Sequence, residues 1–398
     1  MYDFKKVYDR KCDGSMKWSV VSDECNCGCL EHFPLTMADM DFQICPKIKD
    51  GLNAYIQDHI LGYTMPTQDY LETVASYLSG RFAFEIQPEW ILTTPGVVSA
   101  IAAGIRALTQ PQEGVIVFSP VYNPFYEQVQ YSGRQLVKCP MVIDEHGKYQ
   151  LDLDLFEELA AKENNTLLIF CSPHNPGGRV WSAKEIQAVS EICLEHDLHV
   201  ISDEIHGDLA LNGHRHYSFP AVHPKMAQRT IVCSAASKAY NIAGLQCSNV
   251  IIANEEIREN FQAALSSFGI QQANALGLKA TEIAYNDCHD WLEAARKVVE
   301  TNHQLVADFF QTWDNRWKVM PQEASFMAWI NYEAFGIEPE QMIQLLCDEC
   351  HLYVNDGRMY GPEGEGWIRL NVGLPTHELQ GLLERFKETF EEKIQNMA

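Results

Sequence analysis

The sequence lacks any uninterrupted apolar run of the roughly 18 residues that a membrane-spanning helix needs. Its first residues, MYDFKKVYDRKCDG, also lack the apolar core of a signal peptide. Positive charge is scarce, because 30 lysines and arginines stand against 54 aspartates and glutamates, a net charge of −24. No basic patch is visible. We therefore expect a soluble, cytoplasmic protein that binds neither a membrane nor nucleic acid.

Signs of a disulfide framework or a metal site are also missing. Thirteen cysteines are an odd number, and without a secretion signal they favour reduced thiols. Cys25, Cys27 and Cys29 form a CxCxC run that lacks the C-x2-C spacing of zinc sites, so the role of this run stays open. Two histidine pairs offer no better motif: His196 with His199, and His214 with His216. We predict that no metal is bound.

The chain is long enough to form two unequal domains. Its 398 residues exceed the size at which one hydrophobic core usually stops growing. We expect an N-terminal segment at residues 1–47 that joins a smaller domain, a large domain at 48–288, and a C-terminal part of the small domain at 289–398. A long amphipathic run from about Asp287 is expected to be the connecting helix.

The middle of the chain alternates short β-branched runs with helical stretches. This alternation is typical of an α/β fold with a mostly parallel sheet covered by helices. Ser182 and Glu185 form a capping box at the start of a helix between two predicted strands, which makes a β-α-β unit. The predicted strands are VIVFSP, TLLIFCS, HVISDE, TIVCSA and NVIIAN, followed in the C-terminal third by ASFMAWINY and WIRLNVG.

Chemically distinctive residues follow four of the predicted strands. Tyr122, Asn175, Asp203 and Lys238 each come shortly after a strand, and ligands of open α/β sheets bind beyond the carboxyl ends of the strands. A lysine, a carboxylate, an amide and an aromatic ring are what pyridoxal 5′-phosphate (PLP) requires. The lysine forms the Schiff base, and the carboxylate keeps the ring nitrogen protonated. The amide binds the ring oxygen, and the aromatic ring stacks on the face of the cofactor.

Two further segments could bind the anionic groups of such a site, the phosphate of the cofactor and the carboxylate of the substrate. The turn Thr94-Pro95-Gly96-Val97-Val98-Ser99 opens a helix, whose free N–H groups attract a phosphate. Near the other end, the alternation of WIRLNV places Arg369 on one face of a strand, where it can grip a substrate carboxylate through two parallel hydrogen bonds.

Four segments carry a resemblance to a known family: SPHNPGGRVWS, SDEIHGDL, SAASKAYNIAGLQCSNVII and IRLNVG. They resemble fold type I PLP enzymes of the class I/II aminotransferase superfamily, and the match runs over nearly the whole chain. TMADMDF, SDEIH and NIAGLQ are similar to the MalY/PatB-type cystathionine β-lyases. The resemblance implies a PLP-dependent transferase-like fold, with a large domain and a smaller α+β C-terminal domain. It also implies a homodimer with shared active sites.

The resemblance also implies an activity, β-elimination of sulfur from cystathionine- or cysteine-type amino acids to give a thiol, pyruvate and ammonia. It assigns catalytic roles to Lys238, Asp203 and Tyr122, and the substrate carboxylate to Arg369 and Asn175. The residues implied to bind the cofactor are Lys238, Asp203, Asn175, Tyr122, Val97, Val98, Ser237, His206 and, from the partner subunit, Tyr63.

Two positions depart from ordinary aminotransferases. Gln246 stands where many have a phosphate-binding arginine, and His206 where they commonly have a tyrosine. Both changes resemble the β-lyase branch, although His206 alone suits a structural donor equally well.

Elimination and transamination share their early steps, so an aminotransferase remains the alternative enzyme. A regulatory protein that keeps the fold is a third reading. The acidic chain has no region suited to DNA, but a secondary role through protein contact stays open.

Overall fold

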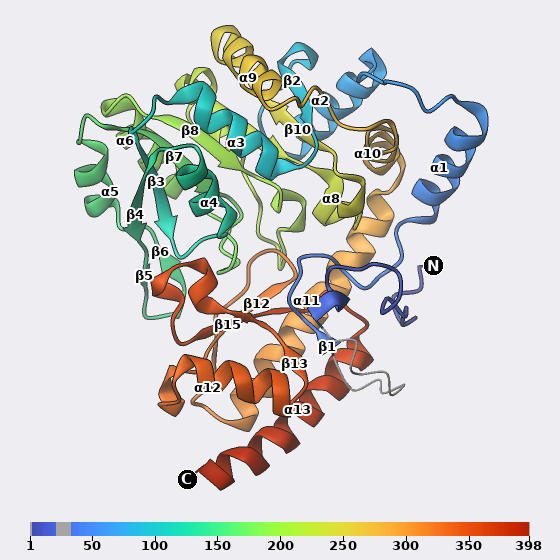
Figure 1. The fold of residues 1–398 in the computed structure, drawn as a ribbon, viewed down its shortest axis with the longest axis vertical. Helices are drawn as coiled ribbons and strands as arrows, with labels where there is room; N and C mark the ends of the chain where they lie inside the picture. Colours follow the sequence, from blue (N-terminus) through green and yellow to red (C-terminus); the bar gives the residue numbers. More distant parts are fainter. Residues whose placement is uncertain (1, 21–32, 398) are drawn as a thin grey trace.

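The structure is a computed structural model that describes residues 2–20 and 33–397. Two layered regions, each built on its own sheet, make up the molecule (Figure 1). The CxCxC run lies outside the described residues. The α-helices are α1 Pro46–Asp58, α2 Gln68–Phe82, α3 Val97–Leu108, α4 Pro124–Tyr131, α5 Leu153–Ala160, α6 Ala183–Glu195, α7 Phe219–Val222, α8 Ala236–Ala239, α9 Glu255–Ser267, α10 Ala275–Asp287, α11 His289–Trp313, α12 Pro339–Gln344 and α13 Thr376–Met397.

The larger sheet has seven strands within the described residues, in the order β2-β10-β9-β8-β7-β3-β4. Neighbours from β9 to β4 pair in parallel, whereas β10 pairs antiparallel with both β9 and β2. The predicted mostly parallel sheet is thus confirmed. The strands are β2 Ile91–Thr94, β3 Gly114–Ser119, β4 Gln135–Pro140, β7 Asn165–Cys171, β8 His199–Asp203, β9 Thr230–Ser234 and β10 Ser248–Ile251.

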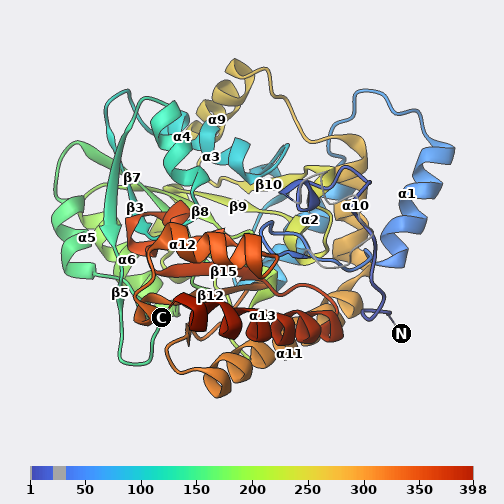
Figure 2. The same cartoon turned by 60° about the horizontal axis from the view of Figure 1, so that its bottom comes forward.

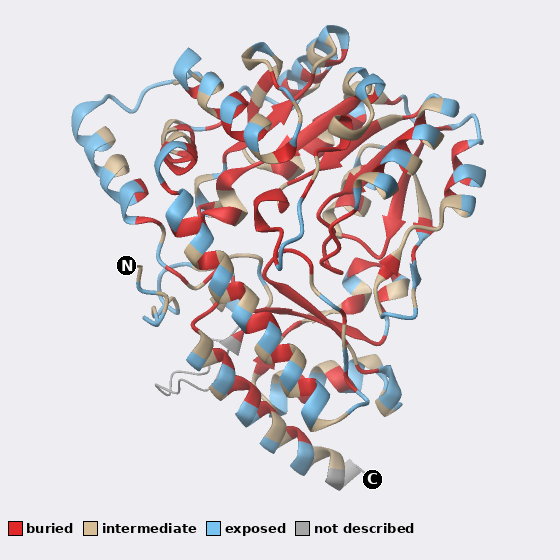
Figure 3. Cartoon of the chain, turned by 180° about the vertical axis from the view of Figure 1, so that it is seen from behind, coloured by how far each residue is buried: buried red, intermediate tan, exposed pale blue. Residues whose placement is uncertain are grey.

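Helices cover both faces of this sheet, as its apolar strands require. Val115 and Val117 of β3 pack with α3, α4 and α9, while Ile116 and Phe118 pack with α5 and α6 on the other face. The capping box of Ser182 and Glu185 begins α6, as predicted. Figure 3 shows the consequence, because the strands are buried and the outer helices carry the exposed positions.

Close contact between α3 and the sheet depends on Gly104. A Cβ atom at this position would lie 2.8 Å from Cδ1 of Ile201 on β8, which is closer than real Cβ contacts come. The glycine therefore lets α3 approach the sheet, and the start of α3 is held beside the ends of the strands.

The smaller sheet has the order β11-β12-β15-β14 and is antiparallel. Its strands are β11 Lys318–Val319, β12 Met327–Asn331, β14 Asn355–Asp356 and β15 Trp367–Asn371. The long helix α11 links the two regions, and α13 packs along it (Figure 2). Two short pairs complete the strands: β5 Val142–Ile143 with β6 Tyr149–Gln150, and β1 Phe33–Pro34 with β13 Leu352–Tyr353.

The segment that follows β1 runs back toward the large sheet. Asn371 donates to the carbonyls of Met37 and Asp39, both at 2.6 Å, and Asn241 donates to the carbonyls of Met40 and Phe42, both at 2.8 Å. Amide side chains from both regions, that of Asn371 fully buried, therefore fix residues 36–42 between the two sheets. We call this stretch the N-terminal strap.

Two expectations about composition can be compared with the described residues. Among these, no helix combines the length and the apolar character needed to cross a membrane. The cysteines described are free thiols, most of them buried.

Candidate active site

A cavity of about 480 Å³ opens at the carboxyl ends of the parallel strands. Its size lies within the usual range for sites that bind small molecules. Most of the residues predicted for the site line it: Val97, Val98, Tyr122, Asn175, Asp203, His206, Ser237 and Lys238. Because these residues come from the ends of β2, β3, β7, β8 and β9, the sheet itself brings them together.

Lys238 lies in α8, just after β9, and its amine enters the cavity. Burial lowers the pKa of this amine to about 8, with Asp39 opposing the shift and Arg369 adding to it. Nζ donates to the carbonyl oxygen of Ala38 in the N-terminal strap at 2.7 Å. A lysine with this pKa is half uncharged at pH 8, where an ordinary lysine is almost wholly charged, and this suits it to act as a nucleophile and a base.

Asp203 ends β8 and is 4% exposed. Burial raises the pKa of its carboxyl to about 7, Glu204 adds to the rise, and the N–H of Ile205 and the charge of Lys238 oppose it. The N–H of Ile205 donates to Oδ1 at 3.1 Å. A buried carboxyl with so raised a pKa is stabilised as an anion when a cation is placed beside it.

The phosphate turn begins α3 at the edge of the cavity. Gly96 is the N-cap residue with φ of 97°, and no side chain caps the first turn of the helix. The first N–H groups of α3 are therefore not bonded by a capping side chain. Together with the helix dipole, these groups can attract an anion at Val97 and Val98.

Arg369 lies on β15 and reaches the cavity region from the smaller sheet. Its guanidinium donates to Asn175 Oδ1 at 3.1 Å, to Asn355 Oδ1 at 3.1 Å and to the carbonyl of Thr36 at 2.6 Å. It lies over the ring of Tyr360, 5.1 Å from the centroid. No carboxylate pairs with it among the described residues, and its buried Nε has no partner there.

His206 and Tyr122 line the cavity together with Asp203. Burial, together with the charges of Lys238 and Arg369, lowers the pKa of His206 to about 3, so its ring is neutral at physiological pH. Its Nδ1 is buried without a partner among the described residues, which a purely structural donor would not be. Burial raises the pKa of Tyr122, and its phenol therefore stays protonated.

Tyr63 does not enter this cavity. It is fully exposed on the loop between α1 and α2. It lines a neighbouring open groove of about 960 Å³, which is also lined by Pro95 and Gln246 from the edge of the cavity.

The sequence motifs did not reveal the backbone contacts of the N-terminal strap. Ala38 lines the cavity and accepts the bond from Lys238, and Met16 lines the cavity as well. The strap matched a family motif, TMADMDF, but its hydrogen bond with Lys238 is made by a main-chain carbonyl, which no side chain of the motif reveals.

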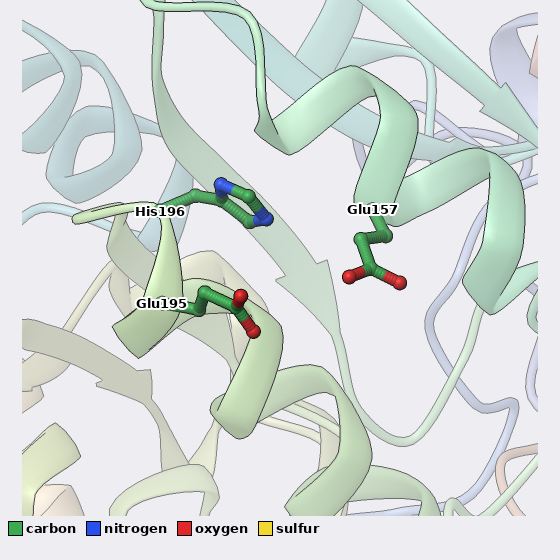
Figure 4. Close-up of side chains that lie close together, drawn as sticks. All are labelled: Glu157, Glu195 and His196. Atoms are coloured by element: carbon green, nitrogen blue, oxygen red, sulfur yellow. The ribbon is translucent and has the colours of Figure 1, made fainter.

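A second group of polar side chains lies away from the cavity, on α5 and at the end of α6. One ligand atom from each of Glu157, Glu195 and His196 lies within 4.8 Å of the others (Figure 4). Both glutamates are exposed, and exposed carboxylates gather in this way without an ion. We assign no metal to this group.

Comparison with known proteins agrees with the fold and the cavity. The family model for aminotransferase class I and II matches residues 33–386. The chain therefore belongs to the aminotransferase class I and II family.

Relatives within this family narrow the assignment. The chain is 35% identical to cystathionine beta-lyase PatB of Bacillus subtilis over 97% of this chain and 99% of that protein. It is 29% identical to protein MalY of Escherichia coli over 96% of both chains. The predicted resemblance to the MalY/PatB branch is confirmed.

Solved structures place a cofactor in this fold. The crystal structure of cystalysin from Treponema denticola, which contains pyridoxal 5′-phosphate, has a TM-score of 0.96 at 35% identity and covers 98% of this chain. The overlap extends over 99% of the cystalysin chain. The PLP-bound C-S lyase from Staphylococcus hominis has a TM-score of 0.90 at 27% identity, with 98% of each chain covered.

Proposed function

We propose that this protein is a PLP-dependent carbon–sulfur β-lyase. It cleaves cystathionine- or cysteine-type amino acids to a thiol, pyruvate and ammonia. The observation that carries this proposal is the meeting of the Lys238 amine and the Asp203 carboxyl in one cavity beside the free N-terminus of α3. Two of the relatives named above favour elimination over transamination, because one is a cystathionine beta-lyase and the other a C-S lyase.

The residues of the cavity fit PLP in charge and in position. Asp203, buried with a raised pKa, would pair with the protonated ring nitrogen, and Lys238 would hold the cofactor covalently. Asn175 accepts a bond from Arg369 at Oδ1, which leaves its NH₂ group to donate to the ring oxygen. Tyr122 would stack on the ring, and the unpartnered Nδ1 of His206 offers one more contact.

The phosphate would lie at the start of α3. Val97 and Val98 supply main-chain donors there, and Ser237 lines the same cavity. No arginine side chain is among the lining residues at this end, where Gln246 stands, so the helix terminus carries most of the neutralisation.

When bound, PLP supplies the electron sink that allows a proton to leave the substrate's Cα and a thiol to leave Cβ. Arg369 binds the substrate carboxylate, with Asn175 beside it, and so fixes which bond faces Lys238. The substrate's amine displaces Lys238 from its covalent link to the cofactor, and the freed lysine, whose pKa lies near 8, then takes the Cα proton. The Cβ–S bond breaks, and uptake of one water converts the remaining fragment to pyruvate and ammonia.

A homodimer completes the site in this proposal. The loop that carries Tyr63 also exposes Ile60, Leu61 and Met65, which are unusually apolar for a solvent-facing loop. The open groove next to the cavity is lined by the same loop. In a twofold dimer the loop of one subunit reaches the groove of the other, where Tyr63 contacts the phosphate.

The cellular location of the protein is proposed from the sequence alone. We place the enzyme in the cytoplasm, acting on small amino acids.

A product assay tests the proposed reaction. The enzyme is incubated with cystathionine, with cysteine and, separately, with an amino donor plus 2-oxoglutarate. We expect pyruvate and a thiol or sulfide from the first two, and little glutamate from the third. Glutamate formation without pyruvate would show that the protein is an aminotransferase.

A further inference from the structure

A second, smaller pocket lies behind the strand-end segment that carries Asp203. It measures about 250 Å³ and lies between the end of α2, the loop at residues 207–216 and α11. Three arginines line it, Arg81, Arg215 and Arg296, together with His214 and His216. We call it the basic pocket. Such a cluster is unexpected in a chain with a net charge of −24.

Several donors around the basic pocket are not used. Nε of Arg296 is buried and has no hydrogen-bond partner among the described residues. Arg215 is exposed, and its guanidinium lies over the ring of Tyr217, 5.3 Å from the centroid. Nη1 of Arg81 lies 3.7 Å from Glu293, which is too far for a hydrogen bond. A buried donor without an acceptor is costly, so these groups call for a ligand with several acceptor oxygens.

Among the residues that line the pocket, three are arginines and one, Asp208, is an acid. Asp208 accepts hydrogen bonds from Arg81 and Tyr77, and the nearby Glu293 is paired with Arg296 at 2.8 Å. Both carboxylates are thus engaged by their own partners. Glu323 is more distant, 3.9 Å from the ring of His214.

The arrangement suits a tetrahedral oxyanion better than a planar carboxylate. The arginines come from three separate elements and so approach one space from different directions. Guanidinium groups pair well with phosphate oxygens. His216, only 2% exposed, joins them from the side of the large sheet, where its Nε2 lies 3.1 Å from Glu204.

We propose that the basic pocket binds a phosphate group, as inorganic phosphate or as the terminal phosphate of a small phosphomonoester. This site is distinct from the phosphate position at the start of α3. Asp203 and His206 face the active-site cavity, whereas the next residues, Gly207 and Asp208, line the basic pocket. The two sites therefore lie on opposite sides of one short segment.

Calorimetric titration of the PLP-saturated enzyme at low ionic strength tests this proposal. Inorganic phosphate is the first probe and glycerol 3-phosphate is the second. We expect one phosphate bound per subunit in the basic pocket. Arg215→Ala and Arg215→Glu should each weaken binding about tenfold or more, because one charge-assisted hydrogen bond is lost. Arg215 is exposed, so its replacement leaves the fold intact, which circular dichroism and PLP absorbance check.

A matched control is Arg316→Ala, which removes the same charge from an exposed arginine paired with Asp314 elsewhere on the molecule. It should bind phosphate as the unaltered enzyme does. Binding of both probes identifies a phosphomonoester pocket, and binding of inorganic phosphate alone identifies a site for the free ion. The proposal fails if the unaltered enzyme takes up no phosphate, or if both Arg215 variants bind it with unchanged affinity.

Discussion

At the scale of single residues, burial adjusts the two central groups in opposite directions. It lowers the pKa of Lys238 to about 8 and raises that of Asp203 to about 7. Each group is thus held close to the pH at which it changes charge. A lysine so placed gives up its proton readily, and a carboxyl so placed gains most from a cation set against it.

The pH dependence of cofactor attachment follows from Lys238. Only the neutral amine attacks an aldehyde, so the rate at which PLP attaches to the cofactor-free protein should rise through pH 8 and level off above it. The shift is downward from the ordinary lysine pKa, so the reactive form gains population at lower pH. Stopped-flow absorbance measures this rate, and a midpoint near the ordinary value of 10.5 would contradict the assignment.

The role of Asp203 is tested by Asp203→Asn. The amide keeps the shape of the side chain but cannot hold a proton on the ring nitrogen. We expect PLP still to bind and kcat to fall about a hundredfold or more. Asp197→Asn, at an exposed carboxylate paired with Arg229, is the matched control and should leave kcat unchanged. An unchanged kcat in Asp203→Asn would remove that carboxylate from the mechanism.

Sequence alone revealed the chemically distinctive side chains because each follows a recognisable strand. It did not reveal the contacts that connect distant segments. The bond from Lys238 to Ala38 spans 200 residues, and Arg369 reaches Thr36 across 333. Such contacts depend on how the two sheets pack, and no local pattern records that packing.

At the scale of helices and strands, sequence patterns that span only a few residues predicted the elements correctly. The capping box predicted the start of α6 correctly, and the β-branched runs predicted β3, β7, β8 and β9. The run NVIIAN was recognised as a strand, but its antiparallel pairing in β10 was not foreseen. The sequence of a fully buried strand does not indicate whether it pairs parallel or antiparallel, since both of its faces are apolar. The two-residue strands, such as β1 and β13, leave no periodic signal at all.

The capping box offers a test at this scale. Ser182→Ala removes the side chain that accepts from the N–H of Glu185, so the free energy of unfolding should fall by about 1 kcal/mol. Urea denaturation measures this change, and the kinetic constants should stay the same. Ser267→Ala, at the exposed end of α9, should alter stability by less than about 0.5 kcal/mol. Equal losses of unfolding free energy in the two variants would show that the capping box contributes no more to stability than an ordinary surface serine.

At the scale of the whole molecule, the proposed dimer is expected to complete the site. Tyr63 is exposed and lies beside a groove that borders the cavity, so the cavity gains its last wall from a second copy in the proposed dimer. The division at residues 47 and 288 remains a prediction. In the structure, the strap and β1 join elements of the C-terminal third to the large sheet.

Mixed dimers test the sharing of sites. Tyr63→Ala and Lys238→Ala chains are each expected to have little activity alone. Mixed in equal amounts and allowed to exchange, they form hybrids with one site that carries both intact residues. About a quarter of the unaltered activity should return, because half of the dimers are hybrids and each has one working site of two. No recovery, in dimers shown to have exchanged, would place Tyr63 in the same subunit's site or outside it.

The central claim is that Lys238 holds PLP in the cavity that it shares with Asp203. Borohydride reduction of the holoenzyme fixes the covalent link, and peptide mapping by mass spectrometry then locates the labelled lysine. The account predicts label on Lys238 and none after Lys238→Ala. Label on any other lysine, or an unlabelled Lys238 in a protein that retains the cofactor, would contradict it.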